Sequence, residues 1–222
     1  MEKLKEEYDE QNVNRIMEGY QAKRKTTFRV NTLKANREEN ISILDSILKS
    51  RGILNKEEFL NPESKELSSP LVFSDMNNAV SIIKNAIKNN DKILIWGDFD
   101  ADGVTSCAIL YKTLQALNAN FMYFIPDRDK LGHGINLKEL LNLKSKNNVK
   151  VLITVDCGIS NAKEINLIKS MGTKVIITDH HEVPSEIPKA DCILNPVCPN
   201  SLSNNLSVSQ IEKVSYLSGA GV

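Results

Sequence analysis

From Lys92 onward the chain alternates short apolar runs with longer amphipathic stretches, and this alternation limits the folds that it can adopt. Each run is rich in β-branched or aromatic residues and is closely followed by Gly, Pro or Asp. Such runs are typical of buried strands, and the amphipathic stretches are typical of helices that connect parallel strands. We therefore predict an α/β fold, doubly wound around a mostly parallel sheet. The predicted strands are Ile93–Trp96, Phe121–Ile125, Val151–Val155, Lys174–Thr178 and Cys192–Leu194.

Four stretches beside these runs are predicted helices, because their apolar residues recur at helical spacing. They are 76–88, 105–117, 136–146 and 161–171, the last with Asn161 at its N-cap position. Residues 1–75 carry shorter, more polar segments, which we predict to form a partly helical N-terminal arm ahead of an α/β domain at 76–222. The Ser- and Asn-rich segment 200–209 is predicted to be a loop.

Composition excludes several classes of protein. Lys+Arg and Asp+Glu both number 28 in 222 residues, so binding of a polyanion would have to depend on a local group of basic residues. No apolar run reaches the roughly 18 residues that would suggest a membrane-spanning helix, and the N-terminus lacks a secretory apolar core. A cytoplasmic protein without membrane contact is therefore expected. The four cysteines, Cys107, Cys157, Cys192 and Cys198, form no CxxC pair, which favours reduced, mostly buried thiols over disulfides or a zinc site.

Polar side chains directly follow four of the predicted strands. Ligands bind beyond the carboxyl ends of the strands in an open α/β sheet, so we expect these side chains to gather at one edge. Asp98, Asp100 and Asp102 alternate after the first strand, which would place them on one side of an extended segment. Such close carboxylates repel one another without a counter-charge, and hard oxygen ligands favour Mg²⁺ or Mn²⁺. The other strand ends contribute Arg128, Asp156, Asp179, His180 and His181.

Plainer interpretations compete with a metal site. The DxDxDG string resembles the start of a calcium loop, but such a loop needs Glu at its twelfth position, where this chain has Ile109. Aspartates at strand ends are also ordinary turn formers and helix caps, an explanation that weakens when four strand ends agree. A lone histidine is more often a surface or core residue, whereas a His-His pair facing carboxylates favours ligation by at least one of them. Arg128 alone would be a solvated charge, yet it precedes a Gly-His-Gly turn that lets an anion approach closely.

Four motifs together resemble the DHH phosphoesterase family. They are GDFDADG at 97–103, RDKLGHG at 128–134, VDCG at 155–158 and TDHH at 178–181. Each alone is weak, but the four in this order are specific. The segments 51–63, 75–87, 193–199 and 218–222 are similar to the RecJ-type exonuclease branch of that family.

The resemblance implies a metal-dependent phosphodiester hydrolase that removes nucleotides from single-stranded DNA in the 5′ to 3′ direction, in repair and recombination. It implies two Mn²⁺ or Mg²⁺ ions bridged by Asp156. It also implies single-stranded nucleic acid, DNA before RNA, as the partner, with a single-strand-binding protein or helicase beside it. The implied metal ligands are Asp98, Asp100, Asp102, Asp156 and His180; the catalytic residues are His181 and Asp179; the substrate-binding residues are Arg128, Gly132, His133 and Gly134.

Two other functions stay open at this point. One is a phosphodiesterase of very short RNA or cyclic dinucleotides, which the long segment before the first motif disfavours. The other is a non-catalytic scaffold, which the retained Asp and His positions disfavour. The family carries a further metal-binding Asp and a second, substrate-gripping domain of the DHHA1 type beyond the last motif. We therefore expect this chain to be an incomplete catalytic domain with reduced activity on its own.

Overall fold

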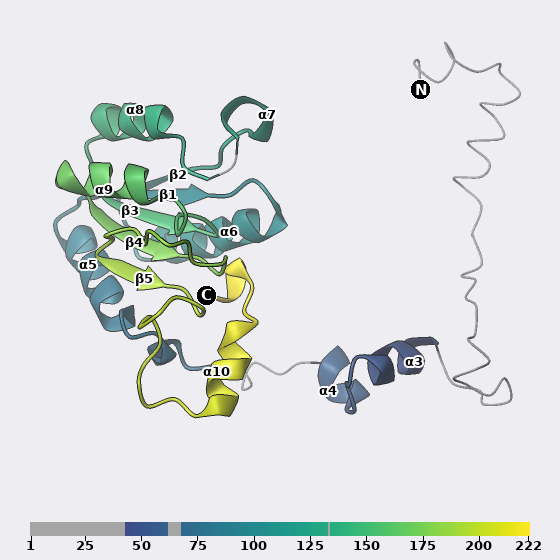
Figure 1. The fold of residues 1–222 in the computed structure, drawn as a ribbon. Coiled ribbons are helices and arrows are strands. Elements are labelled where there is room, and N and C mark those ends of the chain that lie inside the picture. The colour runs from purple at the N-terminus through teal and green to yellow at the C-terminus, as the bar shows by residue number, and fades with distance from the viewer. Residues whose placement is uncertain (1–42, 62–67, 133) are drawn as a thin grey trace, which may run out of the picture. The chain divides into compact units, whose positions relative to one another are not determined.

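The computed structural model describes residues 43–61, 68–132 and 134–222, and its centre is one parallel sheet (Figure 1). In this described part of the chain, five strands lie in the order β2-β1-β3-β4-β5 and every pairing is parallel. The predicted α/β fold is confirmed, and the predicted strands agree with the observed ones to within two residues. The strands are β1 Lys92–Gly97, β2 Phe121–Phe124, β3 Val149–Val155, β4 Lys174–Thr178 and β5 Cys192–Leu194.

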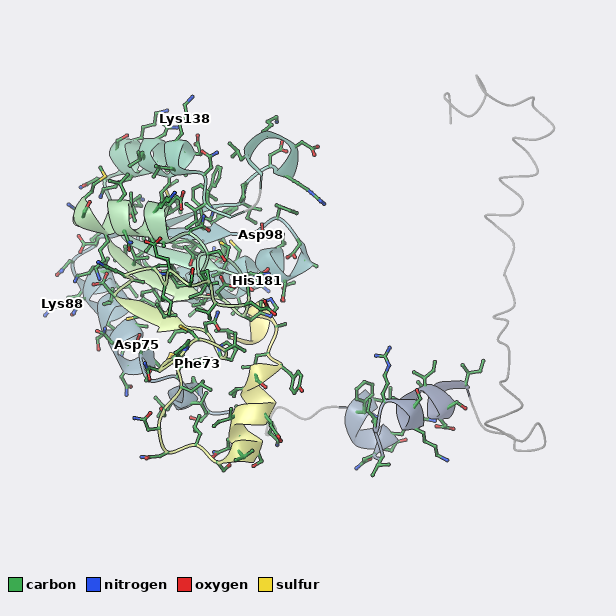
Figure 2. The ribbon with its side chains drawn as sticks, in the orientation of Figure 1. Phe73, Asp75, Lys88, Asp98, Lys138 and His181 are labelled. Carbon is green, nitrogen blue, oxygen red and sulfur yellow. The ribbon has the colours of Figure 1, made fainter. Side chains whose placement is uncertain are left out.

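The register of the sheet brings the strand ends to one edge. Gly97 at the end of β1 pairs with Val155, Val155 with Thr178, and Thr178 with Leu194. The residues that follow β1, β3 and β4 therefore leave the sheet side by side, as predicted for a parallel sheet. Figure 2 shows the labelled Asp98 and His181 at this same end.

Alternate residues of each strand enter two separate apolar cores. Ile93 and Ile95 of β1 belong to one core, while Leu94 and Trp96 belong to the other. Helices α5 (Met76–Lys88), α6 (Ala101–Ala116) and α10 (Val208–Ser215) contribute to the first core, and α8 (Leu137–Asn147) and α9 (Ala162–Ser170) to the second. Because helices cover both faces, the strands are apolar throughout rather than alternating with polar residues.

Several helix bounds differ from the prediction for local reasons. Helix α6 begins four residues earlier than expected, because the Asp100 side chain accepts hydrogen bonds at its N-terminus. Helix α10 begins inside the predicted loop 200–209, where Ser207 and Gln210 form a reciprocal capping box. Asn161 is at the N-cap position of α9, but its side chain accepts no capping hydrogen bond. Short helices α7 (Arg128–Leu131), η2 (Pro70–Val72) and η3 (Gly219–Gly221) complete this unit.

The chain divides into two compact units, 1–63 and 64–222. The described part of the first unit contains α3 (Ile43–Ser50) and α4 (Lys56–Leu60), joined by a Lys56–Asp45 ion pair of 3.0 Å. This agrees with a partly helical arm, and residues 1–42 lie outside the described part. In the second unit Phe73 is buried in the first core, although it precedes the domain boundary predicted after residue 75. That boundary stays a prediction.

The cysteines have the environment expected of structural thiols. All four are free and buried, as predicted. Burial raises the pKa of the Cys107 thiol and raises that of Cys192 to about 12, so these thiols stay protonated. Within the described ranges, no helix combines the length and the apolar character needed to cross a membrane.

Candidate metal centre

The segment after β1 turns directly into a helix. Asp98 is buried, and its carboxylate accepts from the N–H of Phe99 at 2.9 Å. Asp100 is the N-cap of α6 and accepts from the N–H groups of Asp102 and Gly103, both at 2.9 Å. A Cβ at Gly103 would overlap the backbone of Asp98, so only glycine permits this turn. The prediction that the three aspartates alternate along an extended segment is therefore wrong, because helical geometry already applies from residue 101.

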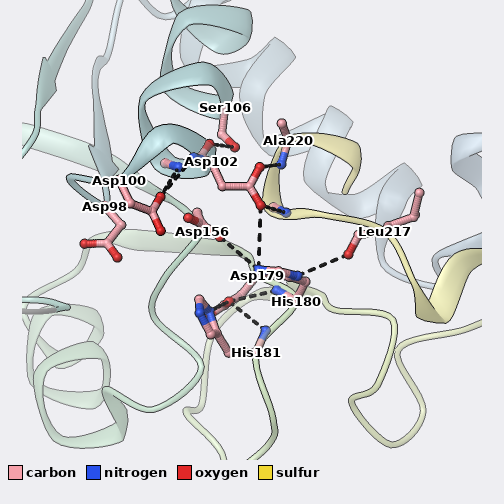
Figure 3. Close-up of polar contacts among 12 residues, drawn as sticks. Asp98, Asp100, Asp102, Ser106, Asp156, Asp179, His180, His181, Leu217 and Ala220 are labelled. Atoms are coloured by element: carbon pink, nitrogen blue, oxygen red, sulfur yellow. Dashed lines mark hydrogen bonds and ion pairs between the residues drawn. The ribbon is translucent and has the colours of Figure 1, made fainter. Parts of the chain in front are cut away.

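Asp102 lies in the first turn of α6, and its carboxylate faces the end of the chain. Its two oxygens accept from the N–H groups of Gly219 at 2.8 Å and Ala220 at 3.0 Å (Figure 3). Burial opposes ionisation, but these hydrogen bonds outweigh it and hold the pKa of Asp102 below its usual value. The carboxylate is therefore stable as an anion without a cation beside it.

Asp156, which directly follows β3, has the opposite environment. Its side chain is 1% exposed, and neither carboxylate oxygen has a hydrogen-bond partner among the described residues. Burial, reinforced by the negative charges of Asp100 and Asp102, raises its pKa to about 7. Its backbone is left-handed, with φ of 59°. A buried carboxylate that accepts no hydrogen bond in a group of acids is the arrangement that a bound cation would satisfy.

The residues after β4 divide into a buried acid and two histidines. Asp179 is 1% exposed; Oδ1 accepts from the N–H groups of His180 (2.8 Å) and His181 (3.1 Å), and Oδ2 accepts from Ile159 (3.0 Å). Oδ1 also lies 2.7 Å from Nδ1 of His181. Burial lowers the pKa of His181, but the hydrogen bond and charge of Asp179 outweigh it, so the net pKa is raised. Asp179 thus has its hydrogen-bonding capacity occupied and orients His181.

His180 lies between the acids of the first and third strand ends. Its Nε2 is 3.2 Å from Oδ1 of Asp156 and 3.8 Å from Oδ2 of Asp102. On the other side of the ring, Nδ1 is 3.1 Å from the carbonyl oxygen of Leu217. Figure 3 shows the ring between these partners.

Two overlapping sets of side chains in the described part of the chain could hold a metal ion. One set is Asp98, Asp100 and Asp156, and the other is Asp156, His180 and His181. Within each set the ligand atoms lie within 4.8 Å of one another, and Asp156 belongs to both. Carboxylate oxygens with imidazole nitrogens suit Mn²⁺ and Mg²⁺, the imidazoles favouring Mn²⁺. Asp102, predicted to be a ligand, belongs to neither set.

The predicted substrate-binding residues are only partly brought to this centre. A cavity of about 200 Å³ beside the acids is lined by Gly134 together with Asp98, Asp156, Asp179 and His181. Trp96 holds Gly134 in place, since its Nε1 donates to the Gly134 carbonyl at 3.2 Å. Arg128 and Gly132 do not line this cavity, and His133 lies outside the described residues.

Arg128 is placed instead by an aromatic ring from the first motif. It begins α7, and its guanidinium carbon is 5.3 Å from the centroid of the Phe99 ring, within the range of a cation–π contact. In the sequence Phe99 lies between Asp98 and Asp100. The contact therefore joins the motif at 128–134 to the motif at 97–103. Arg128 therefore lies near the metal centre but outside its immediate wall.

Several residues of the site were missed by the sequence-based prediction. Ser160 and Asn161 line the cavity, and a Cβ at Gly134 would overlap the Asn161 side chain. Leu217, Gly219 and Ala220 contact the candidate ligands through their backbones. Backbone groups have no side-chain signature, so only the resemblance at 218–222 pointed to this segment.

Known proteins share both the sequence and the fold around this centre. Residues 92–220 match the DHH family, N-terminal domain. The single-stranded-DNA-specific exonuclease RecJ of Bacillus subtilis (strain 168) is 39% identical over 160 residues, which cover 71% of this chain and 20% of that protein. This chain therefore spans about a fifth of that relative's length.

Two solved structures extend the likeness to three dimensions. An exonuclease RecJ bound to manganese superposes with a TM-score of 0.59 at 30% identity, over 70% of this chain and 37% of that one. RecJ from Thermus thermophilus, in complex with Mn²⁺, superposes with a TM-score of 0.55 at 28% identity, over 79% of this chain and 22% of that one. Both of those relatives bind Mn²⁺.

Proposed function

This chain belongs to the DHH family, and from that membership and the geometry of its metal centre we propose that it acts as a metal-dependent exonuclease on single-stranded DNA. The observation that carries the proposal is Asp156, a buried carboxylate that accepts no hydrogen bond from the described residues and lies where the two candidate metal sets meet. The RecJ relatives are single-stranded-DNA-specific exonucleases, which supports single-stranded DNA as the substrate. Repair and recombination, as the processes that this chain serves, are part of the proposal.

We assign two Mn²⁺ or Mg²⁺ ions to this centre. Asp98, Asp100 and Asp156 would hold one, and Asp156 with His180 would hold the other, with Asp102 at the border of the site. When bound, such ions neutralise charge on the phosphate and activate a water for in-line attack. Asp156, shared between the two sets, fits the bridging position.

The chain's own proton donor in this proposal is His181. Asp179 orients the His181 ring and raises its pKa, so more of the imidazole is protonated near neutral pH. The opposite ring nitrogen is left to give a proton to the leaving oxygen. Asp179 is a positioning residue in this scheme, because its oxygens are occupied by backbone N–H groups and the ring.

Substrate capture is assigned to Arg128 and the glycine turn that follows α7. A guanidinium can hold a 5′ phosphate through paired hydrogen bonds, and Gly132 and Gly134, both at φ of 73°, let backbone approach the anion. Capture of the 5′ end at this place would give the 5′ to 3′ direction.

Digestion of a 5′-phosphorylated single-stranded oligonucleotide in Mn²⁺ tests the function. The chain should release mononucleotides, Asp156→Asn should abolish the release, and His181→Ala should slow it about 100-fold or more, the usual range for a general acid. Glu212→Gln, a carboxylate-to-amide change at an exposed position of α10 that belongs to neither candidate metal set, should leave the rate unchanged. Equal rates in all variants, or digestion of cyclic dinucleotides instead of DNA, would overturn the proposal.

Arg128→Ala tests the assignment of the 5′ phosphate. The variant should bind a 5′-phosphorylated oligonucleotide about 1.5 to 3 kcal/mol more weakly, the range for a hydrogen bond to a charged group. It should also lose the preference for a 5′ phosphate over a 5′ hydroxyl. Lys130→Ala removes a positive charge from the same short helix and should preserve that preference. Equal preferences in the two variants would count against Arg128.

A further inference from the structure

We propose that the segment Leu217–Ala220 is a positioning element of the metal centre, whose backbone orients Asp102, Asp156 and His180 toward a bound cation. These three residues come from three different strand ends, and each meets the segment at a separate point. The inference builds on the proposed metal site and adds the group of residues that holds it in shape.

The first point is the tautomer of His180. The carbonyl oxygen of Leu217, 3.1 Å from Nδ1, can only accept, so Nδ1 must carry the proton. In the neutral ring Nε2 is then a lone pair, and it is directed toward Asp156 and Asp102. A metal-binding histidine needs this arrangement, in which a hydrogen bond to one nitrogen leaves the other free for the ion.

The second point is the carboxylate of Asp102. The N–H groups of Gly219 and Ala220 each donate to a different oxygen, at 2.8 and 3.0 Å. Two donors from consecutive residues fix both the position and the plane of the carboxylate. Each oxygen keeps a second lone pair for another partner. Asp102 is therefore held in place before any cation arrives.

The third point is the close approach of Gly219 to Asp156. A Cβ at Gly219 would overlap Oδ1 of Asp156 and would lie 2.7 Å from its Cγ. Asp156 follows a strand and is almost fully buried, so it has little room to withdraw. Glycine is required here for space, and any side chain would push against a proposed bridging ligand.

The segment is itself held firmly enough to serve as a support. Its turn is closed by hydrogen bonds from the N–H groups of Gly221 (2.8 Å) and Val222 (3.2 Å) to the carbonyl oxygen of Ser218. Just before it, Val214 of α10 is fully buried in the first apolar core. The contacts to the ligands thus extend from a packed helix.

The same turn offers a matched pair of substitutions. The three atoms nearest to a Cβ at Gly221 all belong to the Leu217 side chain, and the tightest contact, 3.1 Å to Cδ2, is with its flexible end. Gly219→Ala and Gly221→Ala therefore add the same methyl group two residues apart, and only the first addition reaches a candidate ligand. A role limited to packing would affect the two variants alike.

Calorimetric titration of the metal-free chain with MnCl₂ is the test, with circular dichroism to compare folding. Gly219→Ala should weaken Mn²⁺ binding at least tenfold, equivalent to about 1.4 kcal/mol, while Gly221→Ala should remain within about threefold of the unchanged chain. Unchanged Mn²⁺ affinity in Gly219→Ala, or an equal loss in both variants, would overturn the inference. Absence of Mn²⁺ binding by the unchanged chain would instead overturn the proposed function.

A second measurement keeps the inference testable if Gly219→Ala does not fold. Long-range ¹H–¹⁵N spectra of the unchanged, metal-free chain should show neutral His180 as the Nδ1–H tautomer, with the signals assigned by their loss in His180→Gln. Most free imidazoles prefer the other tautomer, so this result reports the Leu217 contact. A neutral His180 ring that carries its proton on Nε2 would contradict the inference.

Discussion

The carboxylates after β1 and the carboxylate after β3 belong to the same centre, yet their surroundings are opposite. Backbone N–H groups satisfy Asp100 and Asp102, and these hydrogen bonds lower both pKa values against the effect of burial. Asp156 is buried and accepts no hydrogen bond in the described part of the chain, and its pKa is raised to about 7. The fold thus stabilises Asp100 and Asp102 as anions, whereas ionisation of Asp156 depends on a cation.

The largest effect that would test this contrast is the pH dependence of the metal-free protein. Because the folded pKa of Asp156 lies above the ordinary 3.8, its contribution favours folding at low pH and is lost as pH rises toward about 7. A shift of this size corresponds to at most about 4 kcal/mol. Urea unfolding in EDTA between pH 5 and pH 8 should show the loss, and saturating Mn²⁺ should remove it.

His181 acts in the same direction, since its raised pKa also gives stability that is lost as pH rises. The difference between the unchanged chain and Asp156→Asn therefore reports the carboxylate together with the part of the His181 shift that the charge of Asp156 causes. If stability depends on pH in the same way in the two proteins, burial does not raise the pKa of Asp156, and the contrast with Asp102 fails.

Next in size is the response to metal. Mn²⁺ at 100 times its dissociation constant should stabilise the chain by about 2.7 kcal/mol. Asp156→Asn should abolish this gain because it affects both candidate sets, whereas Asp102→Asn should only reduce it. Thermal unfolding with and without MnCl₂ measures the gain, with Glu212→Gln as the control. Equal losses in the two variants would mean that Asp102 and Asp156 contribute equally to metal binding, and the contrast between them would fail.

A smaller effect is expected on the free energy of unfolding of the metal-free chain. Substitutions of Asp102 and Asp156 should change it in opposite directions. Asp102→Asn replaces one acceptor by an NH₂ group facing a backbone N–H, which should destabilise the chain by about 1 to 3 kcal/mol. Asp156→Asn removes a buried charge and should stabilise it. Urea unfolding at pH 8 in EDTA gives both values. Destabilisation by both substitutions would contradict the contrast.

The smallest effect concerns Asp179, which accepts hydrogen bonds from His180 and His181. Asp179 raises the pKa of His181 through a hydrogen bond and its charge, so Asp179→Asn should lower that pKa. NMR titration of the His181 ring in the metal-free chain measures the change. An unchanged His181 titration would show that Asp179 acts only through the backbone N–H groups that it accepts.

Much of the fold could be predicted from local sequence. A strand buried on both faces must be apolar along its length, so the five strands appear as short runs that stop where polar residues begin. The placement of Asp98, Asp156 and His180 at one sheet edge follows, because parallel strands end together. The buried, reduced cysteines were also predictable, since no pair had the spacing of a metal site.

The environment of each acid could not be predicted in this way. The order of residues from 98 to 102 is equally compatible with an extended segment and with a helix start, and tertiary contacts decide for the helix. The donors to Asp102 come from residues about 117 positions away, and they are backbone groups that any residue except proline could supply. The sequence alone therefore determined that the candidate ligands after β1, β3 and β4 gather at one edge of the sheet. Only the tertiary structure decided which of the described acids are stabilised as anions by backbone N–H groups and that Asp156 accepts no such hydrogen bond, because this depends on the folded positions of those groups.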